Sequence, residues 1–299
     1  MVRTLGVLAL LLSVISGCAS TASRDDRAGL APGFDPRAVT VVRGDGSPAS
    51  WDELVSAASG AEAVLWGETH GHAIGLAACA SFWEDLVARA PKAALAMEFF
   101  ERDEQVAIDD YFKGVTDEQA FRKAASRGKG NYPPGHRSMV EKARELKRLV
   151  VAANAPRRYV RLARTEGFER LVGLNDRQRA MFRLPDVLPE GKYRDDFEKI
   201  MGNEPAPAPR KHDDMFRSQS VWDWTMAESV AGTIDSGAVP VLLVVGRFHV
   251  EHRGGLPQAL DHLRTGTRVV SVTCVDASFG ERTPEDAGRA DFVIYVGRD

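Results

Sequence analysis

The stretch AVLWGETH at residues 63–70 decides the fold class, because a short apolar run passes directly into glycine, acid and histidine. The pattern recurs where AALAM at residues 93–97 runs into Glu98, and where VLLVV at residues 241–245 runs into GRFH at residues 246–249. Short apolar runs that stop at polar residues and lead into helix-like segments are typical of buried parallel strands. We therefore expect an α/β fold.

The polar residues that end these strands predict a site. In open α/β sheets the carboxyl ends of the strands border the ligand crevice. Glu68 and His70 are one residue apart, so an extended strand end would place them on one face, while Glu98 and His249 arrive from other strands. A fourth apolar run ends at Asn154. Taken singly, each is as readily a helix cap or a satisfied polar residue at a strand end, but together they favour a shared site.

Strand and helix patterns alternate along most of the remaining chain. This alternation predicts a parallel-rich sheet flanked by helices, with crossovers long enough to be right-handed. A Gly- and Pro-rich stretch at residues 127–136 predicts a loop, and the Pro/Ala run at 204–209 predicts a linker. The basic, mostly helical segment at 156–201 has no place in the sheet, so we expect a helical cap inserted mid-chain over the crevice. The other expected elements are helices at 51–58, 73–89, 139–147, 212–234 and 256–263, an edge strand or hairpin at 38–43, and strands at 149–153, 268–273 and 292–296.

The composition is that of a globular protein with one large domain: 299 residues, 44% of them hydrophobic and 27% charged. A net charge of -3 gives no reason to expect a nucleic-acid partner, which needs a concentrated basic surface. Arg157, Arg158, Arg161 and Arg164 follow roughly helical spacing. Such a row is usually a solvated helix face, and the alternative is a carboxylate or propionate clamp, because guanidinium forks match such groups.

The N-terminus predicts an anchored, exported protein. The apolar run at residues 5–15 is too short to span a bilayer. LSVISGC at residues 12–18 resembles the bacterial lipoprotein cleavage box, in which the cysteine, here Cys18, is lipidated and becomes the first mature residue. The alternative is an ordinary secretory leader. Ala19 after the cysteine, in place of Asp, fits outer-membrane sorting.

We therefore divide the chain into a lipoprotein signal peptide at 1–17, a lipidated cysteine with a flexible tether at 18–37, and an α/β domain at 38–299. Two cysteines remain in the mature protein, and in an exported chain they could pair. Because Cys79 lies in a helical pattern and Cys274 ends an apolar run, we expect buried free thiols instead.

Five motifs in order carry a resemblance: GETH at 67–70, MEFF at 97–100, AANAPR at 152–157, WTMAE at 224–228 and GRFHV at 246–250. Together they resemble the ChaN-like haem-binding lipoprotein family, which is grouped with the Tiki metalloproteases, the TraB proteins and the erythromycin esterases. The similarity extends from about residue 38 to residue 296. It implies a surface-anchored protein that binds haem, acts in haem or iron uptake, and holds haem between two protomers of a homodimer.

The resemblance also implies that a tyrosine holds the iron, and a phenolate is a reasonable ligand for ferric haem. Tyr132 is our choice, because it shares a Gly/Pro loop with His136, and such a loop over the crevice would reach an exposed haem face. Tyr111, Tyr159 and Tyr193 are also possible. The expected cofactor-binding residues are Tyr132, His136, Glu68, His70, Glu98, Asn154 and His249.

The wider superfamily implies a rival function, because its hydrolytic members use the Glu and His positions corresponding to those at the strand ends, and its Tiki branch depends on a divalent metal. In this reading Glu68 and His249 activate water, while Glu98 and His70 bind the metal or orient the base. The reaction would be hydrolysis of a peptide, ester or amide bond. A third hypothesis is a lipid-anchored binding or scaffold protein with a degenerate pocket, which would bind neither haem nor metal.

Overall fold

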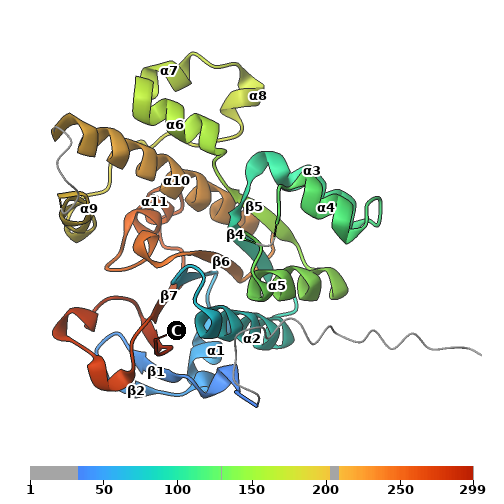
Figure 1. Cartoon of the computed structure of the whole chain (residues 1–299), viewed down its shortest axis with the longest axis vertical. Helices are drawn as coiled ribbons and strands as arrows, with labels where there is room; N and C mark the ends of the chain where they lie inside the picture. The colour runs from blue at the N-terminus through green and yellow to red at the C-terminus, as the bar shows by residue number, and fades with distance from the viewer. Residues whose placement is uncertain (1–32, 129, 203–208, 299) are drawn as a thin grey trace, which may run out of the picture.

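A mostly parallel sheet forms the centre of the computed structural model, which describes residues 33–128, 130–202 and 209–298 (Figure 1). Its strands are β1 (Thr40–Arg43), β2 (Pro48–Ala49), β3 (Ala63–Glu68), β4 (Ala94–Glu101), β5 (Val150–Asn154), β6 (Val241–Gly246), β7 (Val269–Val275) and β8 (Phe292–Tyr295). Their order is β2-β1-β8-β7-β3-β6-β4-β5. Among these strands β1 pairs antiparallel with β2 and β8, and every other neighbouring pair is parallel. The predicted α/β class and parallel-rich sheet are confirmed.

Helices cover both faces of the sheet, so the fold has three layers (Figure 1). The helices are α1 (Trp51–Ser59), α2 (Ala73–Arg89), α3 (Gln105–Phe112), α4 (Glu118–Ala124), α5 (Pro134–Glu145), α6 (Arg157–Glu166), α7 (Phe168–Val172), α8 (Asp176–Arg179), α9 (Lys192–Gly202), α10 (Pro209–Asp235) and α11 (Gly255–Leu263). Helices α1, α2 and α5 pack on one face, and α10 and α11 on the other. The mid-chain helices α6, α7 and α8 lie beyond the edge of the sheet, where α6 packs against α10 and α7 packs against α6 (Figure 1).

Strand β3 shows why the central strands read as unbroken apolar runs. Val64 and Trp66 point into the layer of α2, whereas Ala63 and Leu65 point into the layer of α10. Successive side chains of a strand face opposite sides of the sheet, so a strand covered on both sides buries all of them. Every residue of β3 and of β6 is buried. The polar residues at their ends are therefore the first that can meet a ligand.

Two boundaries differ from the prediction in ways that affect the site. Strand β4 continues to Glu101, so Glu98 lies inside the strand and not after it. Helix α5 begins at Pro134, because proline is favoured in the first turn of a helix. His136 therefore belongs to a helix and not to the predicted loop.

Residues just before position 38 also pack against the domain. Asp35 caps a short 3-10 helix, and the Arg37 guanidinium pairs with Glu84 and Asp85 of α2. The predicted signal peptide, Cys18 and the first part of the tether lie outside the described residues, as does most of the predicted linker at 204–209. Cys79 and Cys274 are buried free thiols, as expected. Within the described part of the chain, no helix combines the length and apolar character needed to cross a membrane.

Candidate functional site

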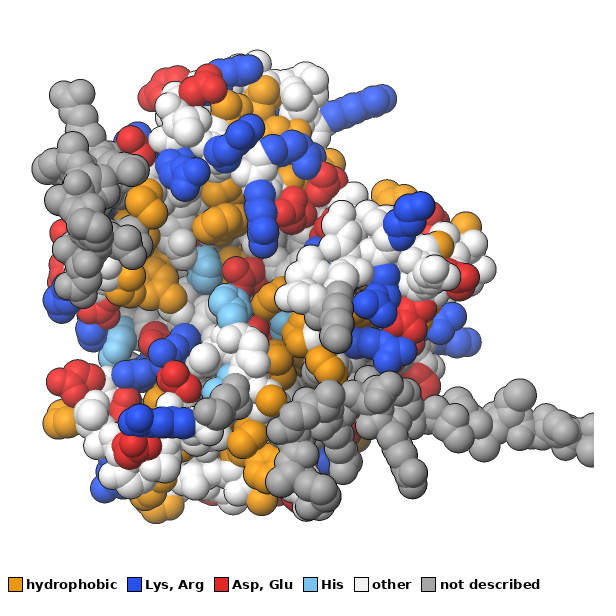
Figure 2. Space-filling view, in the orientation of Figure 1, with side chains coloured by type: hydrophobic (Ala, Val, Ile, Leu, Met, Phe, Trp, Pro, Cys, Tyr) orange, Lys and Arg blue, Asp and Glu red, His pale blue; other side chains and the backbone are white. Residues whose placement is uncertain are grey.

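A crevice of about 650 Å³ lies between the carboxyl ends of the central strands and helices α6 and α10. This volume is within the usual range for small-molecule sites. Figure 2 shows the hollow, with histidine and acidic side chains at its base and Lys or Arg side chains along one rim. His70, Glu98 and Asn154 line it, which confirms that the predicted strand ends converge. The mid-chain helix α6 forms one wall, as expected of the predicted cap.

Glu68 lies beneath the crevice and joins two imidazoles. Its Oε2 is 2.7 Å from His136 Nε2, and its Oε1 is 3.0 Å from His70 Nδ1. Burial by itself would raise the pKa of the Glu68 carboxyl, but the charge and hydrogen bonds of His136 and His70 outweigh it and lower the pKa. Glu68 is therefore held as a carboxylate.

His70 is the accessible member of this trio. Its side chain is 59% exposed, while those of Glu68 and His136 are nearly inaccessible. The hydrogen bond to Glu68 raises the pKa of His70, and partial burial opposes that rise. The Nε2 edge lies above Gly246, where a Cβ would be only 2.8 Å from that nitrogen. Because the φ of Gly246 is an ordinary -56°, this glycine provides space and not an unusual backbone conformation.

A second acid–imidazole network lies deeper, under helix α10. His249 Nδ1 is 2.5 Å from Asp223 Oδ1, and the Tyr193 hydroxyl donates to Asp223 Oδ2 at 2.7 Å. Burial would lower the pKa of His249, but the adjacent Asp223 charge and hydrogen bond, with a contribution from Glu98, raise it. His249 Nε2 is 3.8 Å from Glu98 Oε1. The imidazole thus lies between two carboxylates.

Glu98 and Asn154 connect this network to the crevice. The Glu98 carboxylate accepts a hydrogen bond from the Gly246 N–H at 2.7 Å. The Asn154 side-chain amide donates to the Glu98 backbone carbonyl at 3.1 Å, and its oxygen accepts from the Ala155 N–H. Asn154 therefore fixes the end of β5 against β4 and orients the backbone that carries Glu98.

The wall formed by α6 carries a row of cations. Arg157, Arg161 and Arg164 all line the crevice, and their spacing of four and three residues places them on one helical face. Arg157 is 3.6 Å from Glu101, whereas neither Arg161 nor Arg164 has an ion-pair partner among the described residues. The fourth arginine of the predicted row, Arg158, pairs with Asp103 instead of lining the crevice.

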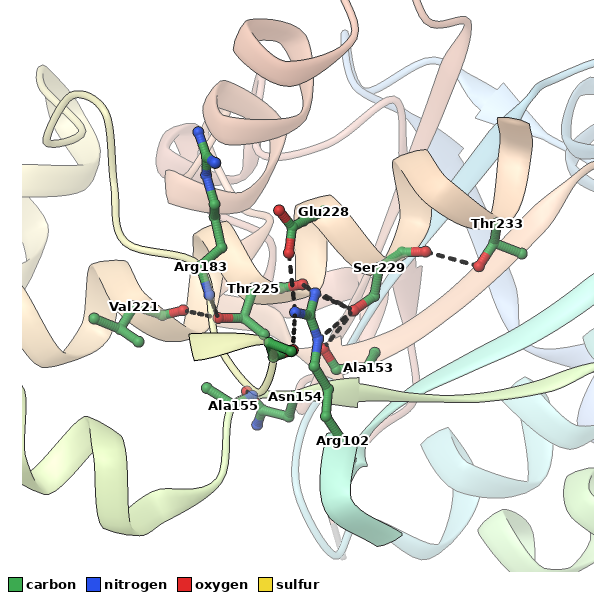
Figure 3. A network of polar contacts seen from close by, with 11 residues as sticks. Arg102, Ala153, Asn154, Ala155, Arg183, Val221, Thr225, Glu228, Ser229 and Thr233 are labelled. Atoms are coloured by element: carbon green, nitrogen blue, oxygen red, sulfur yellow. Dashed lines mark hydrogen bonds and ion pairs between the residues drawn. The ribbon is translucent and has the colours of Figure 1, made fainter. Parts of the chain in front are cut away.

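Helix α10 is held against the strand ends by a polar network around Arg102, drawn in Figure 3. The guanidinium donates to Glu228 Oε2 at 2.9 Å, to the Thr225 carbonyl at 2.9 Å and to Ser229 Oγ. The Ser229 hydroxyl in turn donates to the Ala153 carbonyl at 2.9 Å. Because Arg102 follows β4 and Ala153 belongs to β5, the network positions the helix that supplies Asp223.

The predicted position of Tyr132 is wrong. Its ring packs against Phe100 and Phe121 in the core, and its hydroxyl is buried with no hydrogen-bond partner among the described residues. Tyr111, Tyr159 and Tyr193 are no more accessible, since all five tyrosines of the chain are only 2% to 8% exposed. The hydroxyls of Tyr111 and Tyr193 are already bonded to carboxylates. The 127–136 segment instead contributes polar residues to the crevice, among them Arg127 and Asn131.

The metal site expected for a metal-dependent hydrolase also lacks a suitable geometry. Across residues 33–128, 130–202 and 209–298, no group of three or more His, Cys, Asp or Glu side chains is arranged to hold an ion. His70 and His136 each use one ring nitrogen to pair with Glu68, and His249 pairs with Asp223, so these side chains bind one another in two separate networks.

Sequence reasoning missed Asp223 and Gln219, whose amide nitrogen lies 3.2 Å from the His249 ring, and it considered Tyr193 only as a possible iron ligand and not as a partner of Asp223. A signal for Asp223 was present. Asp223 lies four residues after Gln219 and three before Met226. At helical spacing this places it on the same face of α10 as the buried Met226. A fully buried carboxylate needs a partner.

Comparison with known proteins agrees with this architecture. The family model described as haem-binding uptake, Tiki superfamily, ChaN matches residues 54–260. Among solved structures, ChaN of Campylobacter jejuni with cofacial haem is 17% identical, with 86% of this chain and 96% of that chain covered and a TM-score of 0.66. Erythromycin esterase EreC in its open conformation is 13% identical, with coverage of 83% and 79% and a TM-score of 0.46.

The type III effector HopBA1 is likewise 13% identical, with 83% and 93% covered and a TM-score of 0.45. Comparison with curated proteins gives no significant match. Since the matched model spans more than two thirds of the sequence, the chain belongs to the haem-binding uptake (ChaN) family of the Tiki superfamily.

Proposed function

We propose that this chain, as a member of that family, binds haem in the crevice between α6 and the strand ends. One observation carries the proposal: the crevice joins an apolar and aromatic surface to a row of arginines and one open imidazole. Haem needs these three features, because its ring is flat and apolar, its propionates are anionic and its iron takes an axial ligand.

The residues of the crevice suit each part of the group. Phe99, Val160 and Trp222 supply the apolar surface. Arg161 and Arg164, which have no carboxylate partner among the described residues, are available to propionates. Bound haem would supply a redox-active, ligand-binding iron, while the role of the chain is to hold it, orient it and limit its exposure to water.

The site sits on an anchored protein in this proposal. Cys18 carries the lipid, and residues from 19 to the mid-thirties form the tether. The lipid holds the domain at the outer membrane of the cell envelope. There it takes part in haem or iron uptake. A crevice that opens to solvent also leaves one haem face free, so a second copy of the chain would complete the enclosure and form a homodimer around the haem.

A visible-range titration of the full-length chain in detergent with ferric haem tests the proposal. We expect a saturable Soret shift, and a change in sedimentation on haem addition if two copies share the haem. Arg161→Ala and Arg164→Ala should each weaken binding about 2- to 5-fold, as expected for exposed ion pairs. Arg177→Ala, an exposed arginine of α8 outside the crevice, is the matched control.

Haem dimethyl ester separates charge recognition from apolar binding, because esterification removes both propionate charges. The ester should bind the unmodified chain and the two arginine variants equally. Absence of saturable haem binding by the unmodified chain would contradict the proposed function.

A second candidate function is hydrolysis of an ester or amide, and the buried Asp223–His249 pair favours it. A raised pKa keeps His249 protonated as a general acid facing Glu98. Glu68 orients His70 so that its Nε2 can act as the base. This assignment needs no metal, and it moves the base from His249, as expected from the sequence, to His70, while His249 becomes the acid.

An ester-hydrolysis screen with a chelator present tests this candidate. Asp223→Asn should abolish turnover and leave haem binding intact, because Asp223 is fully buried and does not line the crevice. Turnover that survives Asp223→Asn would exclude the dyad as its source.

A further inference from the structure

Among the residues that the structure describes, the crevice offers one imidazole to a ligand and no phenol. Among the histidine side chains that the structure describes, His70 lines the crevice, His72, His136 and His249 are buried, and neither His252 nor His262 is among the lining residues. All five tyrosines are buried. A residue that binds iron must bring a lone pair to the open space, and burial rules out a phenol oxygen without rearrangement of the core.

We propose that His70, and not a tyrosine, is the protein ligand of the haem iron, with Glu68 as its positioning residue. This inference rests on the proposed function and names the ligand within it. The structure supports it at three points: the orientation of the ring, the space at its free nitrogen, and the support behind it.

The orientation of the ring is fixed by Glu68. Nδ1 is 3.0 Å from Glu68 Oε1, so Nδ1 carries the hydrogen and Nε2 retains its lone pair in the neutral ring. Nε2 itself has no hydrogen-bond partner among the described residues. The centroids of the His70 and Phe99 rings are 5.6 Å apart at an interplanar angle of 89°, and this edge-to-face contact limits the rotation of the imidazole.

Gly246 keeps the free nitrogen accessible. A Cβ at this position would lie 2.8 Å from His70 Nε2 and 3.0 Å from Cε1, closer than real Cβ contacts allow. The backbone of Gly246 is in an ordinary region, so any residue could adopt its conformation. The lack of a side chain at Gly246 therefore keeps the space next to His70 Nε2 open.

Glu68 is itself supported from behind. His136 Nε2 bonds its second oxygen at 2.7 Å, so the carboxylate cannot turn away from His70. An anionic acceptor at Nδ1 strengthens an imidazole as a metal ligand, as carboxylate–histidine pairs do in metal sites. When His70 is protonated, binding releases the Nε2 proton to solvent while the Nδ1 hydrogen stays hydrogen-bonded to Glu68.

Resonance Raman spectroscopy of the ferrous haem complex of the full-length chain tests the assignment. We expect an iron–imidazole stretching band in the unmodified chain. His70→Ala should remove the band, and added imidazole should restore it. Because the His70 side chain is 59% exposed, its truncation should leave the fold intact. The matched control is His262→Ala, whose side chain is 47% exposed and which should keep the band.

Glu68→Gln tests the positioning role of Glu68. The readouts are the frequency of the iron–imidazole band and the reduction potential, neither of which would change if Glu68 were only structural. The amide is neutral, so the band should shift to lower frequency and the reduction potential should rise, while haem remains bound. A band unchanged in frequency would overturn the role of Glu68.

A haem spectrum in His70→Ala identical to that of the unmodified chain would overturn the ligand assignment. So would a phenolate charge-transfer band in the unmodified chain, or a band lost in His70→Ala that imidazole does not restore. Each of these outcomes leaves haem binding itself in place. Absence of any saturable binding would instead refute the proposed function, so the two failures are distinguishable.

Discussion

Replacing Asp223 with asparagine should reverse the pH dependence that His249 gives to the stability of the protein. Asp223 is fully buried, and its two oxygens bind His249 Nδ1 at 2.5 Å and the Tyr193 hydroxyl at 2.7 Å. Asparagine keeps the shape and one acceptor oxygen but removes the charge. The penalty of burial then acts on His249 with only the distant Glu98 charge to oppose it, so its pKa should fall below the ordinary value.

The sign follows from the two folded states. In the unmodified chain the pKa of His249 is raised above its unfolded value of about 6.5, so its contribution is fully present below that pH and is lost as the pH rises through the folded pKa. In the variant a lowered pKa makes the stability fall as the pH drops below about 6.5. The difference in unfolding free energy between the two chains is therefore largest in acid.

The loss of unfolding free energy in Asp223→Asn comes from breaking the buried ion pair between Asp223 and His249. Removal of one partner costs about 3–5 kcal/mol, and asparagine should give the lower end because it still accepts one hydrogen bond. The difference should shrink by at most about 1.4 kcal/mol per pH unit over the range in which His249 titrates.

Urea unfolding of both chains at pH 5.5 and pH 8, with NMR titration of the imidazole protons, measures these quantities. Asp235→Asn is the matched control, since this residue lies on the same helix with its side chain 67% exposed. A difference in unfolding free energy that is equal at the two pH values would refute the reasoning. So would a His249 pKa that stays raised in Asp223→Asn.

Three further changes have defined outcomes. Gly246→Ala places a methyl group 2.8 Å from His70 Nε2, so haem titration should show binding weakened at least 10-fold while circular dichroism shows a retained fold. Arg102→Ala removes the contacts to Glu228, Thr225 and Ser229, and urea unfolding should show a loss of about 2–3 kcal/mol, because hydrogen bonds to charged groups contribute about that much. Cys18→Ser should move the protein from the membrane to the soluble fraction on cell fractionation, with its haem spectrum unchanged.

The sheet was predictable because burial leaves a simple sequence signal. A strand covered on both faces must be apolar at every position, and the runs at 63–66 and 241–245 show this without ambiguity. The convergence of Glu68, His70, Glu98 and His249 followed from topology alone, since parallel strands end at one edge. Helix α2 was placed at its observed bounds because apolar spacing and Pro91 mark its two limits.

The environment of each side chain was not predictable in the same way. Tyr132 lies in a Gly/Pro segment, which suggested a surface loop, yet its ring fills the space between Phe100 and Phe121. Local composition predicts the conformation of the backbone, but it does not predict which residues a side-chain ring contacts. The partner of His249 was hidden for a different reason: Asp223 is 26 residues away on a helix whose docking depends on long-range contacts such as those of Arg102.

The end of β6 joins the two acid–imidazole networks into one site. Gly246 donates its N–H to Glu98, which faces His249, and the same residue leaves space for His70 Nε2. The charge of His249 acts to lower the pKa of His70, so protonation of the deeper imidazole favours the neutral form of the exposed one. The neutral form is the one with a free lone pair at Nε2, which is what iron binding or general-base chemistry requires. A buried imidazolium held between Asp223 and Glu98 therefore opposes, without reversing, the rise in the pKa of His70 that the neighbouring carboxylates cause.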